Sequence, residues 1–161
     1  MNDGKPAASI EQPIRPEENC TMNTPDKPDS LPAGNAPSPV LDLKAFVPAQ
    51  NYDLSKQFYL DLGFTLNWGS NEIAEFQIGA FRFLLQPFYV KEHAGNFMMS
   101  LMVEDTDAWW RHIERIGLKA KYPTIMAQPP AMQPWGLRVL YLSDPTGVLW
   151  HIADRRSGEQ P

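Results

Sequence analysis

The sequence has 161 residues, a formal net charge of −5 and 43% hydrophobic residues. These values fit a single domain with a substantial core, and nothing in the acidic balance suggests a nucleic acid as a partner. No apolar run approaches the roughly 18 residues of a membrane span, and no basic segment followed by an apolar stretch opens the chain, so we expect neither a membrane protein nor a signal peptide.

The first 40 residues hold eight of the 16 prolines and no aromatic residue. Because such a segment buries too little apolar surface to offset its chain entropy, residues 1–40 are predicted to be a disordered, partly polyproline II leader. The leader is either an inert extension or the carrier of a docking motif. It contains the one cysteine, Cys20, which cannot form an intrachain disulfide and fits a cytoplasmic location.

A strand and an amphipathic helix open the predicted domain. Residues 43–47 form a short apolar run typical of a strand, and apolar side chains then recur on one helical face over residues 54–62. Asn51 or Asp53 is expected to cap the helix, and Gly63 is expected to end it in a left-handed conformation. Turn signals divide the following segment into three expected strands, at residues 65–68, 73–78 and 81–88.

The same order of elements then starts again. Residues 97–103 are expected to form a strand, and a helix capped within Asp105-Thr106-Asp107 is expected to close at Gly117. The proline-rich segment 124–134 is interpreted as a loop, and Asp144-Pro145-Thr146-Gly147 as a turn. Three further strands are expected at residues 118–122, 136–142 and 148–153.

The two halves match at one constant sequence offset. Asn51 corresponds to Asp105, Gly63 to Gly117 and Lys44 to Met98, each 54 residues further along the chain. The repeated order of one strand, one helix and three strands indicates an internal duplication.

Two segments resemble a known family. Residues 51–64, NYDLSKQFYLDLGF, are similar to the helix signature of the vicinal-oxygen-chelate superfamily, which includes glyoxalases, bleomycin-resistance proteins and extradiol dioxygenases. Residues 134–148, PWGLRVLYLSDPTGV, resemble the C-terminal hairpin of its bleomycin-resistance-like branch. The resemblance covers about residues 41–154. It implies an α+β fold of two βαβββ modules that form paired curved mixed sheets around a cavity, commonly in a homodimer.

On this basis the chain divides into the leader (residues 1–40), one domain (41–156) and a short C-terminal tail (157–161). The domain contains a first module at about 41–93 and a second module at about 96–156.

The resemblance also locates the positions at which family enzymes bind a divalent metal, which acts there as a Lewis acid. A His on the first strand, a Glu on the fourth, a His or Gln on the fifth and a Glu on the eighth hold that metal. The corresponding residues here are Lys44, then Leu84 or Gln86, then Met98 and His151. A Lys ammonium has no free lone pair, and one His does not supply the donors that a dication needs. We therefore predict neither a metal nor another cofactor.

Alternation along the strands sends every second side chain into the predicted cup. The resulting set is mainly apolar and aromatic with a few polar groups, which suits a small organic ligand, planar or cationic. The alternative is that these side chains fill the core, and that His151 is a surface or structurally satisfied residue. The predicted ligand-binding residues are Lys44, Phe46, Trp68, Leu84, Gln86, Phe88, Met98, Ser100, Met102, Trp135 and His151.

Three functions are compatible with the sequence. The first is a metal-free binding protein that sequesters a drug-like or toxic molecule, by analogy with antibiotic resistance proteins of this family. The second is a lyase, isomerase or dioxygenase with a rearranged metal site that uses His151, Gln86 and Glu75 or Glu104. The third is a non-catalytic interaction module recruited through the leader.

Overall fold

The computed structural model describes residues 38–155. The predicted leader, apart from its last three residues, and the predicted C-terminal tail lie outside this part of the chain. None of the helices in the described part is long and apolar enough to cross a membrane.

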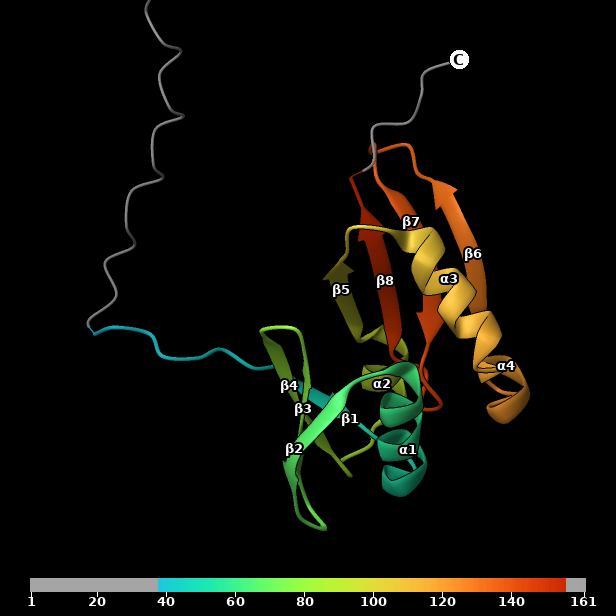
Figure 1. Cartoon of the computed structure of the whole chain (residues 1–161). Coiled ribbons are helices and arrows are strands. Elements are labelled where there is room, and N and C mark those ends of the chain that lie inside the picture. Colours follow the sequence, from blue (N-terminus) through green and yellow to red (C-terminus); the bar gives the residue numbers. More distant parts are fainter. Residues whose placement is uncertain (1–37, 156–161) are drawn as a thin grey trace, which may run out of the picture. The chain divides into compact units, whose positions relative to one another are not determined.

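The described residues form two βαβββ modules, which confirms the predicted α+β fold (Figure 1). A short helix, α2 (Lys91–Asn96), lies on the connection between the modules. Module 1 contains β1 (Phe46–Pro48), α1 (Tyr52–Leu62), β2 (Thr65–Gly69), β3 (Ala74–Ile78) and β4 (Phe81–Gln86). Module 2 contains β5 (Met98–Met102), α3 (Thr106–Arg115), α4 (Leu118–Lys121), β6 (Ala127–Met132), β7 (Arg138–Ser143) and β8 (Leu149–Asp154).

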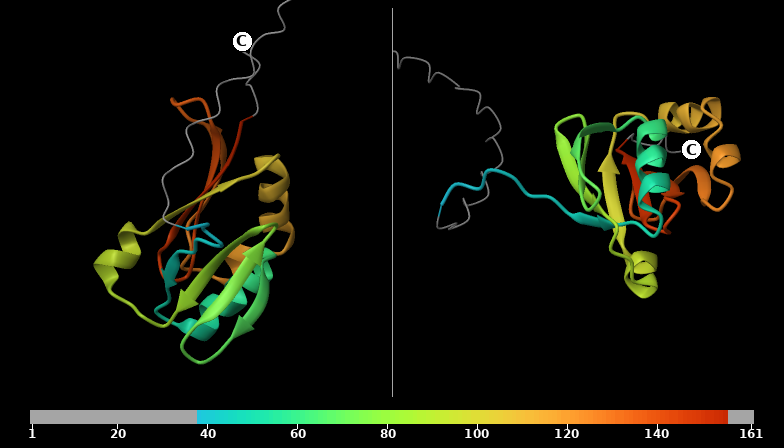
Figure 2. Two further views of the ribbon diagram at one scale, coloured as in Figure 1. Left: turned by 90° about the vertical axis from the view of Figure 1, so that its left-hand side faces the viewer. Right: turned by 90° about the horizontal axis from the view of Figure 1, so that it is seen from below.

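Each module builds one four-stranded mixed sheet with the same topology. Sheet A has the strand order β1-β4-β3-β2, and sheet B has the order β5-β8-β7-β6. The first strand of each module pairs in parallel with the last one, and the remaining pairs are antiparallel. The further views in Figure 2 show the two sheets as separate layers, with α2 outside both. In these strand orders the first strand of each module, β1 or β5, lies at an edge of its sheet.

The expected local signals fix the ends of the helices. Asn51 is the cap of α1, because its side chain accepts a hydrogen bond from the Leu54 amide at 3.0 Å. Gly63 ends this helix with φ +106°, a left-handed conformation that glycine adopts without strain. Asp105 caps α3 in the same way through the Ala108 amide at 2.9 Å. The corresponding residues Asn51 and Asp105 therefore cap the corresponding helices of the two modules.

Replacing the cap should separate the two candidates that the sequence left open. We expect Asn51→Ala to lower the free energy of unfolding by about 1 kcal/mol, because the Leu54 amide loses its acceptor. Asp53→Ala, in the first turn of the same helix, should lower the free energy of unfolding by only a few tenths of 1 kcal/mol. Asp53 contributes only the interaction of its charge with the helix dipole and a solvent-exposed ion pair with Lys56. Urea unfolding of both variants measures the difference, and equal losses would contradict the assignment.

One part of the second module differs from the prediction. Residues 118–122 do not form a strand, because Leu118–Lys121 is the helix α4. The sixth strand is instead β6, within the segment that was interpreted as a loop. Pro129 and Pro130 are tolerated there because β6 is an edge strand, and because its register with β7 shifts between Gln128 and Ala131.

The core lies on the helix side of both sheets and joins the two modules. Tyr59 of α1 is fully buried, with its ring 4.9 Å from that of Phe83 in sheet A and 5.9 Å from that of Trp150 in sheet B. Ile113 of α3 belongs to the same buried cluster. The modules therefore share one hydrophobic core, and the other face of each sheet is left for function.

Candidate functional site

Sheet A has one face covered by α1 and one open face. On the open face, Phe46, Leu84 and Glu75 are register partners in one row across β1, β4 and β3. Trp68 pairs with Glu75 at a bulge in β2. Phe46 and Trp68 are about half exposed, at 51% and 49%. Large aromatic side chains on an exposed sheet face are a common feature of interaction sites.

The position of the family's first metal ligand is taken by an ion pair. The Lys44 ammonium contacts the carboxylates of Asp42 at 2.7 Å and of Glu75 at 2.5 Å. Hydrogen bonds to Asp42 and Glu75 raise the pKa of Lys44. The hydrogen bond from Lys44 lowers the pKa of Glu75, and a hydrogen bond from Asn67 acts in the same direction. Arg82 approaches the same carboxylate at 4.0 Å, so fixed cations already surround it.

The ion pair predicts an acid dependence of stability. Because the pKa of Glu75 is lower in the folded protein than its usual value of 4.5, its contribution is complete above that pH and is lost as pH falls through the lowered folded pKa. We expect Glu75→Gln to flatten the decrease in unfolding free energy below pH 4.5. Urea unfolding across this range measures the slope, and Glu72→Gln, in the exposed β2–β3 turn, is the matched control. Identical slopes in all three proteins would contradict the prediction.

Sheet B has a corresponding open face. Ser100 pairs with His151, and His151 pairs with Tyr141, so these three residues form a row across β5, β8 and β7. The Tyr141 and His151 rings meet edge to face with centroids 4.9 Å apart. Within the described residues, His151 Nε2 is buried without a hydrogen-bond partner. Met98 lies on the same face and is 65% exposed.

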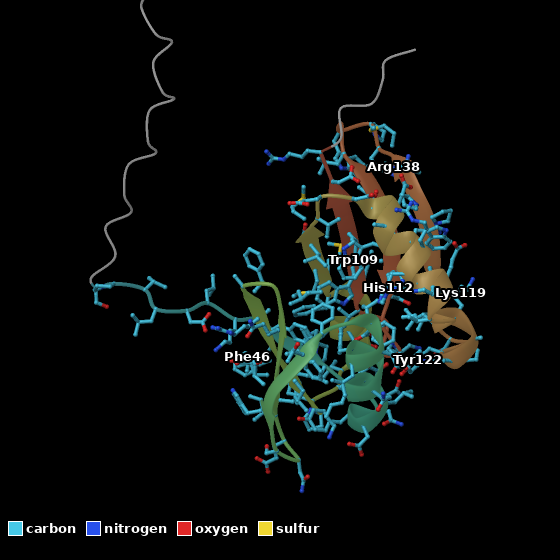
Figure 3. All side chains as sticks on the ribbon, in the orientation of Figure 1. Phe46, Trp109, His112, Lys119, Tyr122 and Arg138 are labelled. Atoms are coloured by element: carbon cyan, nitrogen blue, oxygen red, sulfur yellow. The ribbon has the colours of Figure 1, made fainter. Side chains whose placement is uncertain are left out.

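The structure places the predicted ligand-binding residues in two groups (Figure 3, where Phe46 marks sheet A and Arg138 marks sheet B). Phe88 follows β4 and is exposed, and Trp135 is exposed in the β6–β7 hairpin. Ser100 and Met102 also border a cavity between the modules. Sheet A carries the group Lys44, Phe46, Trp68, Leu84 and Gln86, and sheet B carries the group Met98, Ser100, Met102 and His151.

The residues do not fit the family's metal. Among residues 38–155, no group of three or more His, Cys, Asp or Glu side chains is arranged to hold a metal ion. The set His151, Gln86 and Glu75 or Glu104 is therefore not assembled as a ligand cluster. At the first-strand position, the Lys44 ammonium would repel a dication. Lys44 also forms an ion pair with Glu75, so this carboxylate already has a cationic partner.

The two segments that carried the family resemblance contact each other. The Tyr59 hydroxyl of α1 donates to Asp144 Oδ2 at 2.9 Å, and the Trp150 indole N–H approaches the Tyr59 hydroxyl at 3.3 Å. Burial raises the pKa of Tyr59 well above its usual value, and burial also raises the pKa of Asp144. Ser55 and Thr146 add a hydroxyl pair at 3.3 Å. These polar contacts therefore link the two modules.

His112 of α3 contacts the end of α1. It is half buried, and its Nε2 lies 3.1 Å from the Leu62 carbonyl oxygen at the end of α1. Its Nδ1 lies 2.9 Å from Arg115 Nη2. His112 therefore links α3 to the first module, and no sequence motif signals such a contact.

Comparison with known protein families decides the family. Residues 43–152 match the family model described as Glyoxalase/Bleomycin resistance protein/Dioxygenase superfamily. The chain belongs to this superfamily. No curated protein sequence matches it significantly.

Solved structures of the glyoxalase/bleomycin resistance superfamily share the fold. The bleomycin resistance determinant encoded on transposon Tn5 is 24% identical with a TM-score of 0.59, and the match covers 71% of this chain and 98% of that one. The bleomycin-binding protein from Streptomyces verticillus, in complex with copper(II)-bleomycin, is 22% identical with a TM-score of 0.59, over 71% and 96% of the two chains. A lactoylglutathione lyase from Agrobacterium tumefaciens is 15% identical with a TM-score of 0.55, over 76% and 100%. At these identities the likeness concerns the fold.

Proposed function

We propose that this protein is a metal-free member of the superfamily that binds and sequesters a small organic molecule, planar or cationic, on the open faces of its sheets. The observation that carries the proposal is the Lys44–Glu75 ion pair at the position of the family's first metal ligand. The Lys44 ammonium already balances the negative charge of Glu75, so no metal ion is needed to neutralise this carboxylate. It keeps the aromatic and methionine side chains that make a binding surface.

The proposed site contains the predicted residues of both open faces. Phe46 and Trp68 supply flat rings, Met98 and Met102 supply adaptable apolar contact, and His151 supplies a buried nitrogen without a partner among the described residues. Stacking on the rings and hydrogen bonding to His151 Nε2 would hold a planar ligand.

We further propose that the protein is a homodimer in the cytoplasm. The outer edges of β1 and β5 have no strand partner within the described part of the chain, and the adjacent open faces expose apolar side chains. A second copy of the chain that packs along these edges would cover the apolar surface beside them, which is costly to leave in water, and would enclose the ligand on the open faces. The single cysteine supports the cytoplasmic location.

The proposal is tested on the purified full chain. We expect elemental analysis to find no stoichiometric zinc, nickel, manganese or iron, and light scattering to give the mass of a dimer. In thermal-shift assays, metal-free bleomycin or a planar aromatic drug that binds should raise the melting temperature of the protein, because a ligand that binds only the folded state stabilises it. The increase should be the same before and after the protein is treated with a chelator.

Substitutions then locate the site. Phe46→Ala should weaken binding of any hit by about tenfold, since one well-placed aromatic contact contributes on the order of 1.4 kcal/mol. Leu60→Ala, on the outer face of α1, is the control and should leave binding unchanged. A stoichiometric metal, or ligand binding that disappears with the chelator, would overturn the metal-free function and favour the enzyme hypothesis.

A further inference from the structure

A cavity lies between the two modules. Its volume is about 430 Å³, inside the range of about 300–1,000 Å³ that is typical of small-molecule pockets. Phe81 and Phe83 of β4 line it from module 1, and Met99 and Leu101 of β5 line it from module 2. These four residues have the opposite strand parity to Leu84, Met98 and Ser100, so the cavity is mainly a feature of the helix side of the sheets.

Three buried rings form a rigid wall of this cavity. Phe64, Phe83 and Trp150 pack edge to face against one another, with centroid distances of 5.5 to 5.7 Å. All three side chains are almost completely buried, and all three also pack against Tyr59. Because the rings hold one another in place, they cannot rotate freely into the empty space. Such a wall offers ring edges and faces to a flat apolar guest.

Two polar side chains also line the cavity, Arg82 and Ser100. Arg82 Nε donates to Gln77 at 3.1 Å, and the guanidinium lies 3.6 Å from Asp42 and 4.0 Å from Glu75. A guanidinium has five N–H donors, which is more than these contacts require, and it recognises carboxylates through two parallel bonds. Lys44 also forms ion pairs with Asp42 and Glu75, so Arg82 is not the only cation that balances these two carboxylates.

We propose that this cavity binds a compact aromatic carboxylate, with its ring system against the Phe64–Phe83–Trp150 wall and its carboxylate at Arg82 and Ser100. The cavity shares Ser100 and Met102 with the open face of sheet B. Its ring wall lies on the helix side of the sheets, so its existence does not rest on the function proposed above.

Naphthalene-2-carboxylate is a suitable probe. We expect calorimetry on the full chain to show saturable binding of one probe molecule per chain. In spectra of protein labelled with ¹³C at the methionine methyl groups, the Met99 signal should shift because Met99 lines the cavity. Met126 and Met132, which lie outside its wall, should not shift. Absence of saturable binding at millimolar probe, or a shift confined to Met126 and Met132, would overturn the proposal.

Three variants complete the test. Leu101→Trp fills the cavity and should abolish binding, whereas Leu60→Trp makes the same substitution on the outer face of α1 and should leave it intact. Arg82→Met keeps an apolar chain in place of the aliphatic part of Arg82, removes the guanidinium and should weaken binding by about tenfold through loss of the charge-assisted hydrogen bond. Binding that survives both Leu101→Trp and Arg82→Met contradicts the site. If Leu101→Trp fails to fold, the Met99 shift and the Arg82→Met affinity still decide the question.

Discussion

Replacing Asp144 by Ala should destabilise the protein by about 3–5 kcal/mol, the cost of removing one partner from a buried charged hydrogen-bond network. Asp144 is 1% exposed and lies in the β7–β8 turn. Its Oδ1 accepts from the amides of Thr146, Gly147 and Val148 at 2.8 to 2.9 Å, and its Oδ2 accepts from the Tyr59 hydroxyl. Ala would leave the amides of Thr146 and Val148 and the Tyr59 hydroxyl without the carboxylate acceptor, and the Gly147 amide would keep only the backbone carbonyl of residue 144. Urea unfolding followed by circular dichroism measures the loss.

Asp144→Asn is the matched control, because an amide oxygen can still accept from the turn. We expect it to cost about 1–2 kcal/mol at pH 5. Burial raises the pKa of Asp144 in the folded protein, so the folded state holds the proton more tightly than the unfolded state does. The stabilisation from this difference is largest below the usual pKa and is lost as pH rises through the raised one. The stability gap between the native protein and Asp144→Asn should therefore narrow as pH rises, and a gap that widens would contradict the assignment.

Trp150→Ala should cost about 3–5 kcal/mol, the usual range for removing a large aromatic side chain from a core. Trp150 is 3% exposed, and its ring packs against those of Tyr59, Phe64 and Phe83 of the other module. Its indole N–H also approaches the Tyr59 hydroxyl. Because Trp150 connects the modules, the loss should appear as one cooperative unfolding transition at a lower melting temperature.

Trp135→Ala is the control for this prediction. Trp135 is 59% exposed in the β6–β7 hairpin, so its removal should change the unfolding free energy by no more than about 0.5 kcal/mol. Two separate transitions in Trp150→Ala would show that each module is stable alone, and would contradict the view that one shared core stabilises both. Equal losses in the two tryptophan variants would contradict the assignment of Trp150 to that core.

Local signals predicted most of the fold. The Asn51 and Asp105 caps and the left-handed Gly63 act within a few residues of themselves, and hydrogen bonds over such short separations leave a direct mark on the sequence. The apolar alternation also assigned Met98, Ser100 and Met102 to one face of their strand, because alternation is a local property of a strand.

The sixth strand shows where local reasoning failed. Prolines normally argue against a strand, and Pro129-Pro130 argued for a loop. The segment is nevertheless β6, because it lies at the edge of sheet B and the irregular register absorbs the missing N–H donors. Whether a strand is at an edge depends on the order of the other strands in the sheet.

The sequence by itself determined the duplicated module, the short segments that cap its helices and the residue types at the family's metal positions, because each of these is a feature of a short segment of the chain. The tertiary structure alone decided that Glu75 neutralises Lys44, that Tyr59 donates to Asp144 and that the modules share a core and a cavity. These contacts join residues that are distant in the chain, and they depend on how two sheets and two helices pack, which no local pattern records.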